Sequence, residues 1–344
     1  MAHIRRKALL AVLGAAVAAC GLVCTAAAQT NTGTTIGQFM LIEPNARIAG
    51  MGNAGVSMYE GLGSAYYNPS LAARETGYQL SFTHSAWFAG ITYDYAAASM
   101  ALGSLGQIYG SLTALNSGDI EVRTVNQPQG TGELFKVSDI ALALGYAKQI
   151  TLRFAAGAQV NYAQENIWHS SVSTVTFNIG TLYRLSENGL RIGSSLSNFG
   201  TRGAFNGADL RFTYDNTPAV FGDNSQLPGS RFTDPFPVPV LFRVGLGMPY
   251  QPNHDTKVIV AADLFQPHDN TESMSVGAEA TLKDRVSLRA GWQNLFLQDS
   301  EVGLALGAGL QGRLDVYHYH CDYAWADEGR LGHVHRISLG LSFQ

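Results

Sequence analysis

The chain has 344 residues, of which 46% are hydrophobic and only 14% are charged, whereas roughly a quarter of an average soluble domain is charged. Its mean hydropathy of +0.02 is too low for a bundle of membrane helices. The formal net charge of −4 also argues against nucleic-acid binding, which needs a basic surface.

The first residues have the pattern of a secretory signal peptide, and we expect residues 1–28 to be removed. Basic residues at positions 5–7 precede an apolar run over 8–23, and Ala26–Ala28 offer the small residues of a cleavage site. Cys20 completes a Val-Ala-Ala-Cys sequence that resembles a bacterial lipoprotein box, so lipid attachment there is the alternative.

Cleavage near Ala28 changes the charge and the cysteine count. It leaves 22 − 3 = 19 basic and 26 acidic residues, a net charge of −7. Cys321 is then the single cysteine, which excludes an internal disulfide and a multi-cysteine metal site. The rest of the chain contains no apolar run long enough for a membrane helix.

From about residue 77 onward, apolar and polar side chains alternate. Over 152–162 the even positions are apolar and the odd positions are mostly small or polar, the pattern of a strand with one apolar face. About fourteen such segments follow one another, and most have around ten residues, the length of a tilted strand that crosses a bilayer. They run over 77–85, 88–100, 105–115, 137–149, 152–163, 172–185, 189–197, 241–248, 257–265, 272–282, 285–292, 302–310, 314–325 and 333–343.

The links between these segments alternate between short and long. Those at 150–151, 186–188, 283–284 and 311–313 are tight, whereas those at 116–136, 198–240, 293–301 and 326–332 are long and polar. Short turns at one end and long loops at the other are typical of bacterial outer-membrane barrels. The link at Ala86–Trp87 does not fit, because it should be a long loop and is very short.

The sequence therefore predicts an all-β fold, a transmembrane outer-membrane antiparallel β-barrel of about 14 strands. The barrel would cover residues 77–344, with a long loop at 198–240. The protein would lie in the bacterial outer membrane, in contact with its lipids.

Residues 29–76 do not alternate and are rich in small side chains, so we expect a compact N-terminal hatch inside the barrel. Gly50, Gly52 and Gly55 have the G-x-G-x-x-G spacing of a dinucleotide-binding turn. That interpretation requires a strand before the turn and a helix after it, and an exported protein is the wrong setting. We therefore expect no cofactor, and we expect the glycines to let the backbone turn tightly and pack against the barrel wall.

Charged residues lie opposite the apolar faces of the predicted strands and would point into the lumen. They are Asp94, Asp139, Arg153, Arg191, Arg243, Asp263, Glu279, Arg285 and Arg289. Because buried charges are tolerated only when they are paired or hydrated, a lumen of mixed sign predicts ion pairs with the hatch through Arg47 and Glu43. A solute-binding lumen is the alternative, although a fatty acid would need a continuous apolar path.

Histidines near the C-terminus form a candidate metal site, which strand parity argues against. His318, His320 and Asp322 share one face of a predicted strand and could bind a divalent metal. His333 and His335 fall on the lipid-facing side of the next strand, so we expect no metal. No G-x-S-x-G elbow occurs in the mature chain, and we expect no catalytic residue and no enzyme.

Several stretches, in order along the chain, resemble the PorV/PorQ family of outer-membrane proteins within the FadL-like superfamily. They cover 46–55, 64–72 with Asn68-Pro69, 189–193 leading to 197–200, and 329–336. The resemblance implies a barrel of about fourteen strands whose hatch motif comprises Arg47, Gly50, Gly52, Gly55, Asn68 and Pro69. FadL-like members move hydrophobic small molecules. PorV-like members serve type IX secretion, receiving exported cargo and passing it to surface-attachment partners.

The long loop at 198–240 bears prolines and the aromatic residues Phe221, Phe232 and Phe236, which suits protein recognition; a lid over the barrel mouth is the alternative. This loop and the charged lumen favour a non-enzymatic partner in type IX-like protein secretion, which would contact secretion-system proteins and exported cargo. The first rival is a FadL-like transporter of hydrophobic small molecules, which a lateral opening or an apolar tunnel through the hatch would favour. The second rival is a barrel with only a structural or assembly role.

Overall fold

The computed structural model describes residues 33–59, 61–74, 77–186, 189–216, 219, 226–297 and 300–343, which belong to one compact unit. The predicted signal peptide lies outside the described residues, and so does Phe221 of the long loop.

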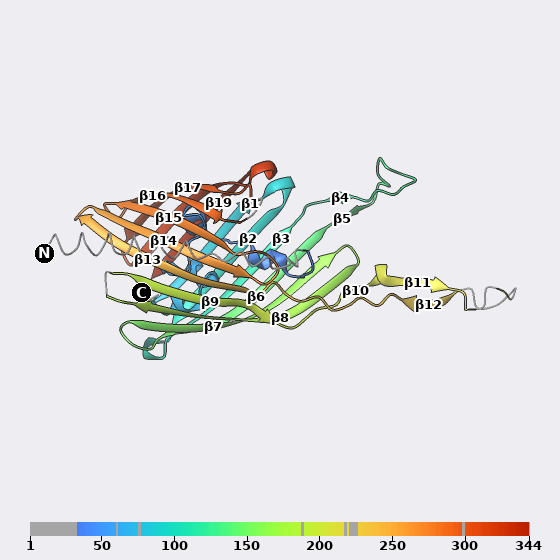
Figure 1. Ribbon diagram of the computed structural model, residues 1–344, viewed down its shortest axis with the longest axis horizontal. Coiled ribbons are helices and arrows are strands. Elements are labelled where there is room, and N and C mark those ends of the chain that lie inside the picture. Colours follow the sequence, from blue (N-terminus) through green and yellow to red (C-terminus); the bar gives the residue numbers. More distant parts are fainter. Residues whose placement is uncertain are drawn as a thin grey trace. The chain divides into compact units, whose positions relative to one another are not determined.

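Fourteen antiparallel strands form a closed barrel (Figure 1). They are β1 (Tyr78–Ala86), β2 (Thr92–Ala101), β3 (Gln107–Asn116), β6 (Val137–Gln149), β7 (Phe154–Ile167), β8 (Ser170–Arg184), β9 (Arg191–Gly200), β13 (Leu241–Asn253), β14 (Thr256–Pro267), β15 (Ser273–Leu282), β16 (Val286–Leu295), β17 (Leu304–Leu314), β18 (Tyr317–Asp327) and β19 (His333–Phe343). Neighbours in this order pair with each other, and β1 pairs with β19 to close the barrel. Each strand corresponds to one predicted segment, so the predicted barrel is confirmed.

The barrel strands turn their apolar side chains outward. On β1, Leu80 and Phe82 are 52% and 46% exposed, whereas Ser81 and Thr83 are 8% and 1% exposed. This arrangement is the reverse of a soluble protein, and it suits a wall that meets lipid on one side and a polar lumen on the other. The protein is therefore an outer-membrane barrel.

The two ends of the barrel differ in their links. We call the end with the links at 117–136, 201–240, 268–272, 296–303 and 328–332 the long-loop end, and the other end the short-turn end. The long links carry two ribbons, β4 (Ile120–Glu121) with β5 (Leu134–Phe135) and β11 (Arg211–Tyr214) with β12 (Leu227–Ser230), together with β10 (Asn206–Gly207), η6 (Ala208–Leu210) and η7 (Gly329–Leu331). The short turn η5 (Gly103–Leu105) lies at the opposite end.

The exceptional short link after β1 has a simple structural explanation. The predicted strand over 88–100 starts too early, because η4 (Phe88–Gly90) forms a tight turn there and Ala89 has a positive φ of 55°. Trp87 N donates to Ile91 O at 2.9 Å and closes this turn.

Residues 33–74, which we call the N-terminal segment, fold into short helical turns. These are η1 (Gln38–Leu41), α2 (Ala46–Ala49), η2 (Leu62–Tyr66) and η3 (Pro69–Arg74). The turn α2 packs on β17, β18 and β19, whereas η3 packs on β6, β7 and β8. The N-terminal segment therefore lies inside the barrel and contacts the wall on opposite sides. Among the described residues, no helix is long and apolar enough to cross a membrane.

Candidate functional site

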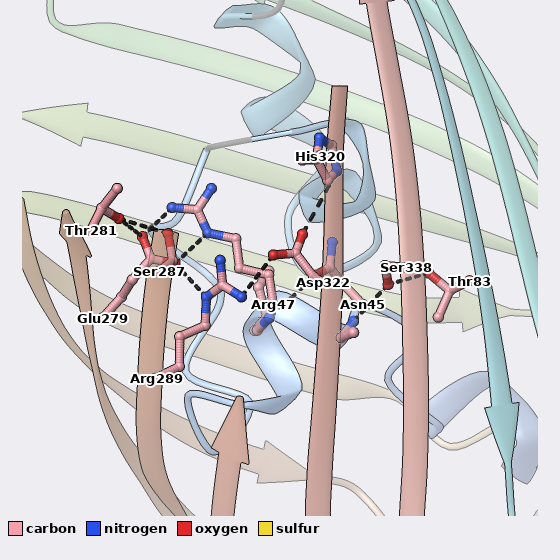
Figure 2. Close-up of polar contacts among 12 residues, drawn as sticks. Asn45, Arg47, Thr83, Glu279, Thr281, Ser287, Arg289, His320, Asp322 and Ser338 are labelled. Atoms are coloured by element: carbon pink, nitrogen blue, oxygen red, sulfur yellow. Dashed lines mark hydrogen bonds and ion pairs between the residues drawn. The ribbon is translucent and has the colours of Figure 1, made fainter. Parts of the chain in front are cut away.

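A buried ion network joins the N-terminal segment to the barrel wall. Arg47 of α2 donates from Nε to Glu279 Oε2 of β15 at 2.7 Å, and its Nη2 pairs with Glu279 Oε1 (Figure 2). The Glu279 side chain is only 1% exposed, so water does not screen this bidentate pair. The predicted ion pair between Arg47 and the wall is thus present in the structure.

Further wall residues extend this network around the lumen. Arg289 of β16 donates from Nε to Glu279 Oε2 at 2.5 Å, and its Nη1 lies 2.7 Å from Asp322 Oδ1 of β18. His320 Nε2 is 3.9 Å from the other oxygen of Asp322 (Figure 2). Two arginines therefore face two carboxylates, and their charges cancel in a site where Glu279, Arg289 and Asp322 are almost fully buried.

Hydrogen bonds fix the start of α2 beside this network. Asn45 caps the turn, since its Oδ1 accepts from Ile48 N at 3.2 Å. Ala46 N donates to Ser338 Oγ of β19 at 2.9 Å, and Ser338 Oγ lies 2.7 Å from Thr83 Oγ1 of β1 (Figure 2). A main-chain donor of the N-terminal segment is therefore tied directly to the wall, next to Arg47.

A second charge of the N-terminal segment has the opposite sign. Glu43 Oε1 lies 3.9 Å from Nη2 of Arg243 on β13. Arg243 is 1% exposed, and its Nη1 donates to Ser197 Oγ at 3.3 Å. The expected contact of Glu43 with the wall is therefore present, although it is looser than that of Arg47.

The hatch-motif glycines allow close contacts, as expected for two of the three. A Cβ on Gly50 would lie 2.9 Å from the Cα of Gly307, and a Cβ on Gly52 would lie 2.7 Å from the backbone N of Trp292. Gly55 differs, because a Cβ there would meet Ile48 at 2.6 Å within the N-terminal segment itself rather than the wall.

Asn68 and Pro69 of the hatch motif also contact the wall. Asn68 is fully buried, and its Nδ2 donates to Val56 O and to Thr181 O of β8, both at 2.9 Å. A Cβ on Gly157 of β7 would lie only 2.6 Å from the backbone carbonyl of Pro69, which is too close for a side chain. One asparagine therefore links two parts of the N-terminal segment and the wall.

The structure brings six of the nine predicted lumen charges to the inward face. Arg191, Arg243, Asp263, Glu279 and Arg289 are buried there, and Asp139 is half-buried on the same side of β6. Asp263 Oδ2 accepts from Val56 N at 2.8 Å, and the Arg191 guanidinium lies 3.9 Å from the centre of the Tyr59 ring. Parity therefore identified the wall residues that hold the N-terminal segment.

The other three expected lumen charges lie elsewhere. Asp94 is on the outward face of β2, where its Oδ1 lies 2.7 Å from His84 Nδ1 and its side chain is 40% exposed. Parity failed there because Tyr93 and Tyr95, which suggested a lipid-facing side, point inward, and Tyr93 donates to Ile42 O at 2.7 Å. Arg153 and Arg285 are exposed in turns just before β7 and β16, outside the strands in which parity applies.

The candidate metal residues and loop aromatics are also separated. His318 and His320 face the lumen side of β18, whereas His335 faces outward, with its Nδ1 2.8 Å from Tyr323 Oη. Among the described residues, no group of three or more His, Cys, Asp or Glu side chains is placed to hold a metal ion.

In the long loop, Phe232 is 87% exposed, whereas Phe236 is 37% exposed and its backbone pairs with Gly203.

Sequence reasoning missed Asp322 as an ion-pair partner and gave no role to Arg336. A partial signal for one pair was available, since parity puts Glu279 and Arg289 on the lumen side of neighbouring strands, where they face each other. The predicted turn at 283–284 would have paired Glu279 with Leu288 instead; the turn has three residues, 283–285. Nothing in the sequence indicated that Arg289 also reaches Asp322 on a strand two places away.

Two of the cavities that border the N-terminal segment lie on either side of its stretch 41–53. One, of about 580 Å³, opens at the long-loop end and is lined by Leu41, Ile42 and Asn53 of the N-terminal segment and by Phe265 and Arg336 of the wall, among others. The other, of about 190 Å³, lies towards the short-turn end and is lined by residues that include Arg47, Arg289 and His320. The stretch 41–53, with Arg47 at its centre, therefore lies between the two cavities.

Comparisons with known proteins agree on the fold. No protein-family model and no curated protein sequence matches the chain. Among solved structures, the toluene transporter TodX of Pseudomonas putida is similar with a TM-score of 0.53 at 13% identity, over 88% of this chain and 98% of TodX. The toluene transporter TbuX of Ralstonia pickettii has a TM-score of 0.54 at 10% identity, over 88% of this chain and 99% of TbuX. A FadL homologue from Pseudomonas aeruginosa has a TM-score of 0.54 at 12% identity, over 87% of this chain and 98% of the homologue.

These identities are too low to show more than architecture, and membership of the PorV/PorQ family is not shown. The similar structures are transporters and channels rather than enzymes. The chain thus has the fold of the FadL-like outer-membrane channels.

Proposed function

We propose that the protein is an outer-membrane channel for small hydrophobic molecules, in which the N-terminal segment is the hatch. This function is the predicted alternative of a transporter, and it replaces the type IX secretion role, for which neither the fold nor the comparisons give support. Similar structures that are named as toluene transporters support it, and so does the lumen itself.

The observation that carries the proposal is the pair of cavities on either side of the stretch 41–53. A barrel with only a structural role needs no space on both sides of its plug. Apolar side chains such as Leu41, Ile42 and Phe265 line the larger cavity and would hold a hydrophobic solute that enters from the long-loop end.

Passage requires the contacts between the two cavities to open. The Arg47–Glu279–Arg289 network and the Ala46–Ser338 hydrogen bond hold the stretch 41–53 in place. Pairing between β1, β2 and β3 is continuous and without a register shift, so the wall there offers no lateral gap. Because the two cavities lie towards opposite ends of the lumen, we expect the solute to pass along the barrel axis once the hatch is displaced.

Uptake of labelled toluene by intact Gram-negative cells tests this proposal, because the lipopolysaccharide leaflet slows its passive entry. Cells that display the protein should take up toluene several-fold faster than cells with an empty vector, while uptake of a sugar of similar size stays the same. Equal toluene uptake, with the protein folded in the outer membrane, would contradict the proposal.

A protein partner at the long loop is a second candidate, favoured by the exposure of Phe212, Tyr214 and Phe232 on and beside the β11–β12 ribbon. Comparison of the surface and secreted proteins of a deletion strain with those of its parent tests this role. Selective loss of exported proteins, with their accumulation in the periplasm, is the expected outcome of a secretion role. An unchanged set of secreted proteins would remove that candidate.

A further inference from the structure

Arg336 of β19 is a buried charge that forms no ion pair within the described part of the chain. It is 2% exposed, and its guanidinium carbon lies 5.0 Å from the centre of the Trp87 ring. Across the described residues, neither Nε nor Nη1 has a hydrogen-bond partner, and no carboxylate oxygen lies within 4.0 Å of the guanidinium. Buried charges in proteins are normally paired and hydrogen-bonded, so this group lacks the partner that its environment demands.

A second polar group without a partner lies beside it. Ser85 of β1 is directly opposite Arg336 in the β1–β19 pairing, and both side chains point into the lumen. Ser85 Oγ is fully buried and makes no hydrogen bond within the described part of the chain. Ser85 therefore does not satisfy the Arg336 guanidinium, although the two residues face each other.

The acids that line the same cavity form no ion pair with Arg336 among the described residues. Asp269 already accepts hydrogen bonds of 2.9 and 2.6 Å from the N-terminal segment. Glu43 has Arg243 as its nearer cation, and burial raises the pKa of Glu43 to about 7, so its charge is partial near neutral pH. Burial also raises the pKa of Glu328 in the loop after β18, whereas the charge of Arg336 lowers it. Neither acid forms an ion pair with Arg336 in the described part of the chain, so the guanidinium has no directly bonded anion.

Apolar surface adjoins this charge in the cavity of about 580 Å³. Trp87, Leu241 and Phe265 line the same cavity as Arg336. An inorganic anion would leave these side chains unmatched, whereas a hydrocarbon would leave the guanidinium unpaired. The lining suits a molecule with an anionic acceptor group at one end and an apolar body at the other.

We propose that this cavity binds a small ring-containing organic carboxylate, whose carboxylate group is held by Arg336. The inference rests on the proposed channel and names the ligand class that its outer cavity takes. A planar carboxylate matches the planar guanidinium and can accept two hydrogen bonds from it. Trp87 and Phe265 would contact the ring.

Calorimetric titration of the purified full-length protein in detergent tests the ligand class without any substitution. Benzoate and benzyl alcohol have similar ring size but differ in charge. Benzoate should bind tighter than benzyl alcohol by about tenfold to a hundredfold, the range of a lost charge-assisted hydrogen bond. Equal binding of the two, or displacement of benzoate by an equal concentration of inorganic phosphate, would overturn the proposal.

The variant Arg336→Gln tests the residue. It should abolish the preference for benzoate, and Arg336→Lys should retain part of it. Arg153→Gln, which removes an exposed arginine in a turn, is the matched control and should bind benzoate as the unaltered protein does. If Arg336→Gln still preferred benzoate over benzyl alcohol as strongly as the unaltered protein does, another group would hold the benzoate carboxylate. If cells take up toluene but the protein does not bind benzoate, this inference fails while the proposed channel stands.

Discussion

Two charges of opposite sign in the N-terminal segment each meet the opposite charge on the barrel wall. Arg47 lies against Glu279, whereas Glu43 lies near Arg243. Because the wall presents an acid at one place and a base at the other, a shifted or reversed segment would bring like charges together. We infer that these pairs specify how the N-terminal segment fits inside the barrel, beyond any stability that they supply.

Removal of the shared carboxylate tests this arrangement. Glu279→Gln leaves Arg47 and Arg289 buried without their anion, and we expect it to lower the free energy of unfolding by about 3–5 kcal/mol. Urea titration of the protein in detergent micelles measures this change. Arg285→Gln, at an exposed turn, should change it by less than about 0.5 kcal/mol. A loss of stability in Glu279→Gln no larger than in Arg285→Gln would show that the network is hydrated.

For single residues, the sequence predicts which wall side chains face inward, but not which side chains they pair with. Strict alternation assigns Arg243, Asp263 and Glu279 to the lumen, because a strand has no other way to present them. The contact of Arg47 with Glu279 joins residues far apart in the chain, and no periodicity encodes it. Asp94 was assigned wrongly, since aromatic side chains can face either the lipid or a tightly packed lumen.

Secondary-structure elements fit together through glycines that let backbones touch. Gly52 has a positive φ of 65°, and a Cβ on it would lie 2.7 Å from the backbone N of Trp292. Gly103 in a turn has a similar φ of 61° with nothing within 4 Å. The two positions therefore share the conformational cost of a side chain but differ in the space available.

Alanine substitution at these two glycines separates the effects. Gly103→Ala should lower the free energy of unfolding by about 1–2 kcal/mol, the cost of a left-handed conformation. Gly52→Ala should cost about 1–3 kcal/mol more, because the backbone of β16 must move. Thermal unfolding of both variants, compared with the unaltered protein, measures the difference. Similar losses of unfolding free energy in the two variants would mean that a side chain at position 52 fits beside Trp292 without moving β16.

Two loops at the long-loop end are joined by an exposed ion pair whose strength depends on pH. Arg330 Nε lies 2.5 Å from Glu301 Oε1, and Arg330 N donates to Glu301 Oε2 at 3.1 Å. These hydrogen bonds lower the pKa of Glu301 below its ordinary value of 4.5. The stabilising effect is therefore complete above pH 4.5, declines below it and is lost once the pH falls through the lowered pKa.

Hydrogen exchange of the Arg330 amide reports on this pair, after correction for the intrinsic effect of pH on exchange. Protection should be greater near pH 7 than near pH 3, by a small factor because both side chains are largely exposed. In Glu301→Gln the corrected protection should not change between these pH values. A pH-dependent protection that persists in Glu301→Gln would assign the effect to another group.

Element boundaries were predicted less well than the elements themselves. All fourteen strands follow from alternation, yet β2 begins four residues later than the pattern suggested, at Thr92 instead of Phe88. The tight turn at Phe88–Gly90 consists of residues that also suit a strand, and the positive φ angles of Ala89 and Gly90 distinguish it. Local sequence does not encode that choice, because pairing of β1 with β2 decides where the turn must fall.

At the scale of the whole molecule, a closed wall surrounds an N-terminal segment with space on both sides. The wall is predictable from the sequence because lipid outside and polar groups inside impose period two on every strand. The cavities are not predictable, since they depend on how a segment without regular periodicity packs against side chains from many strands. The function of the barrel depends on whether that segment moves.

A reversible cross-link between the N-terminal segment and the wall tests this claim most directly. Ala46→Cys with Ser338→Cys, in a Cys321→Ser background, puts thiols on two residues in direct contact, since Ala46 N donates to Ser338 Oγ at 2.9 Å. Labelled toluene uptake is then measured in intact cells before and after reduction. We predict that uptake is slow while the disulfide holds the segment and returns to the unaltered rate on reduction. Unchanged uptake with the disulfide fully formed would contradict a hatch that must move.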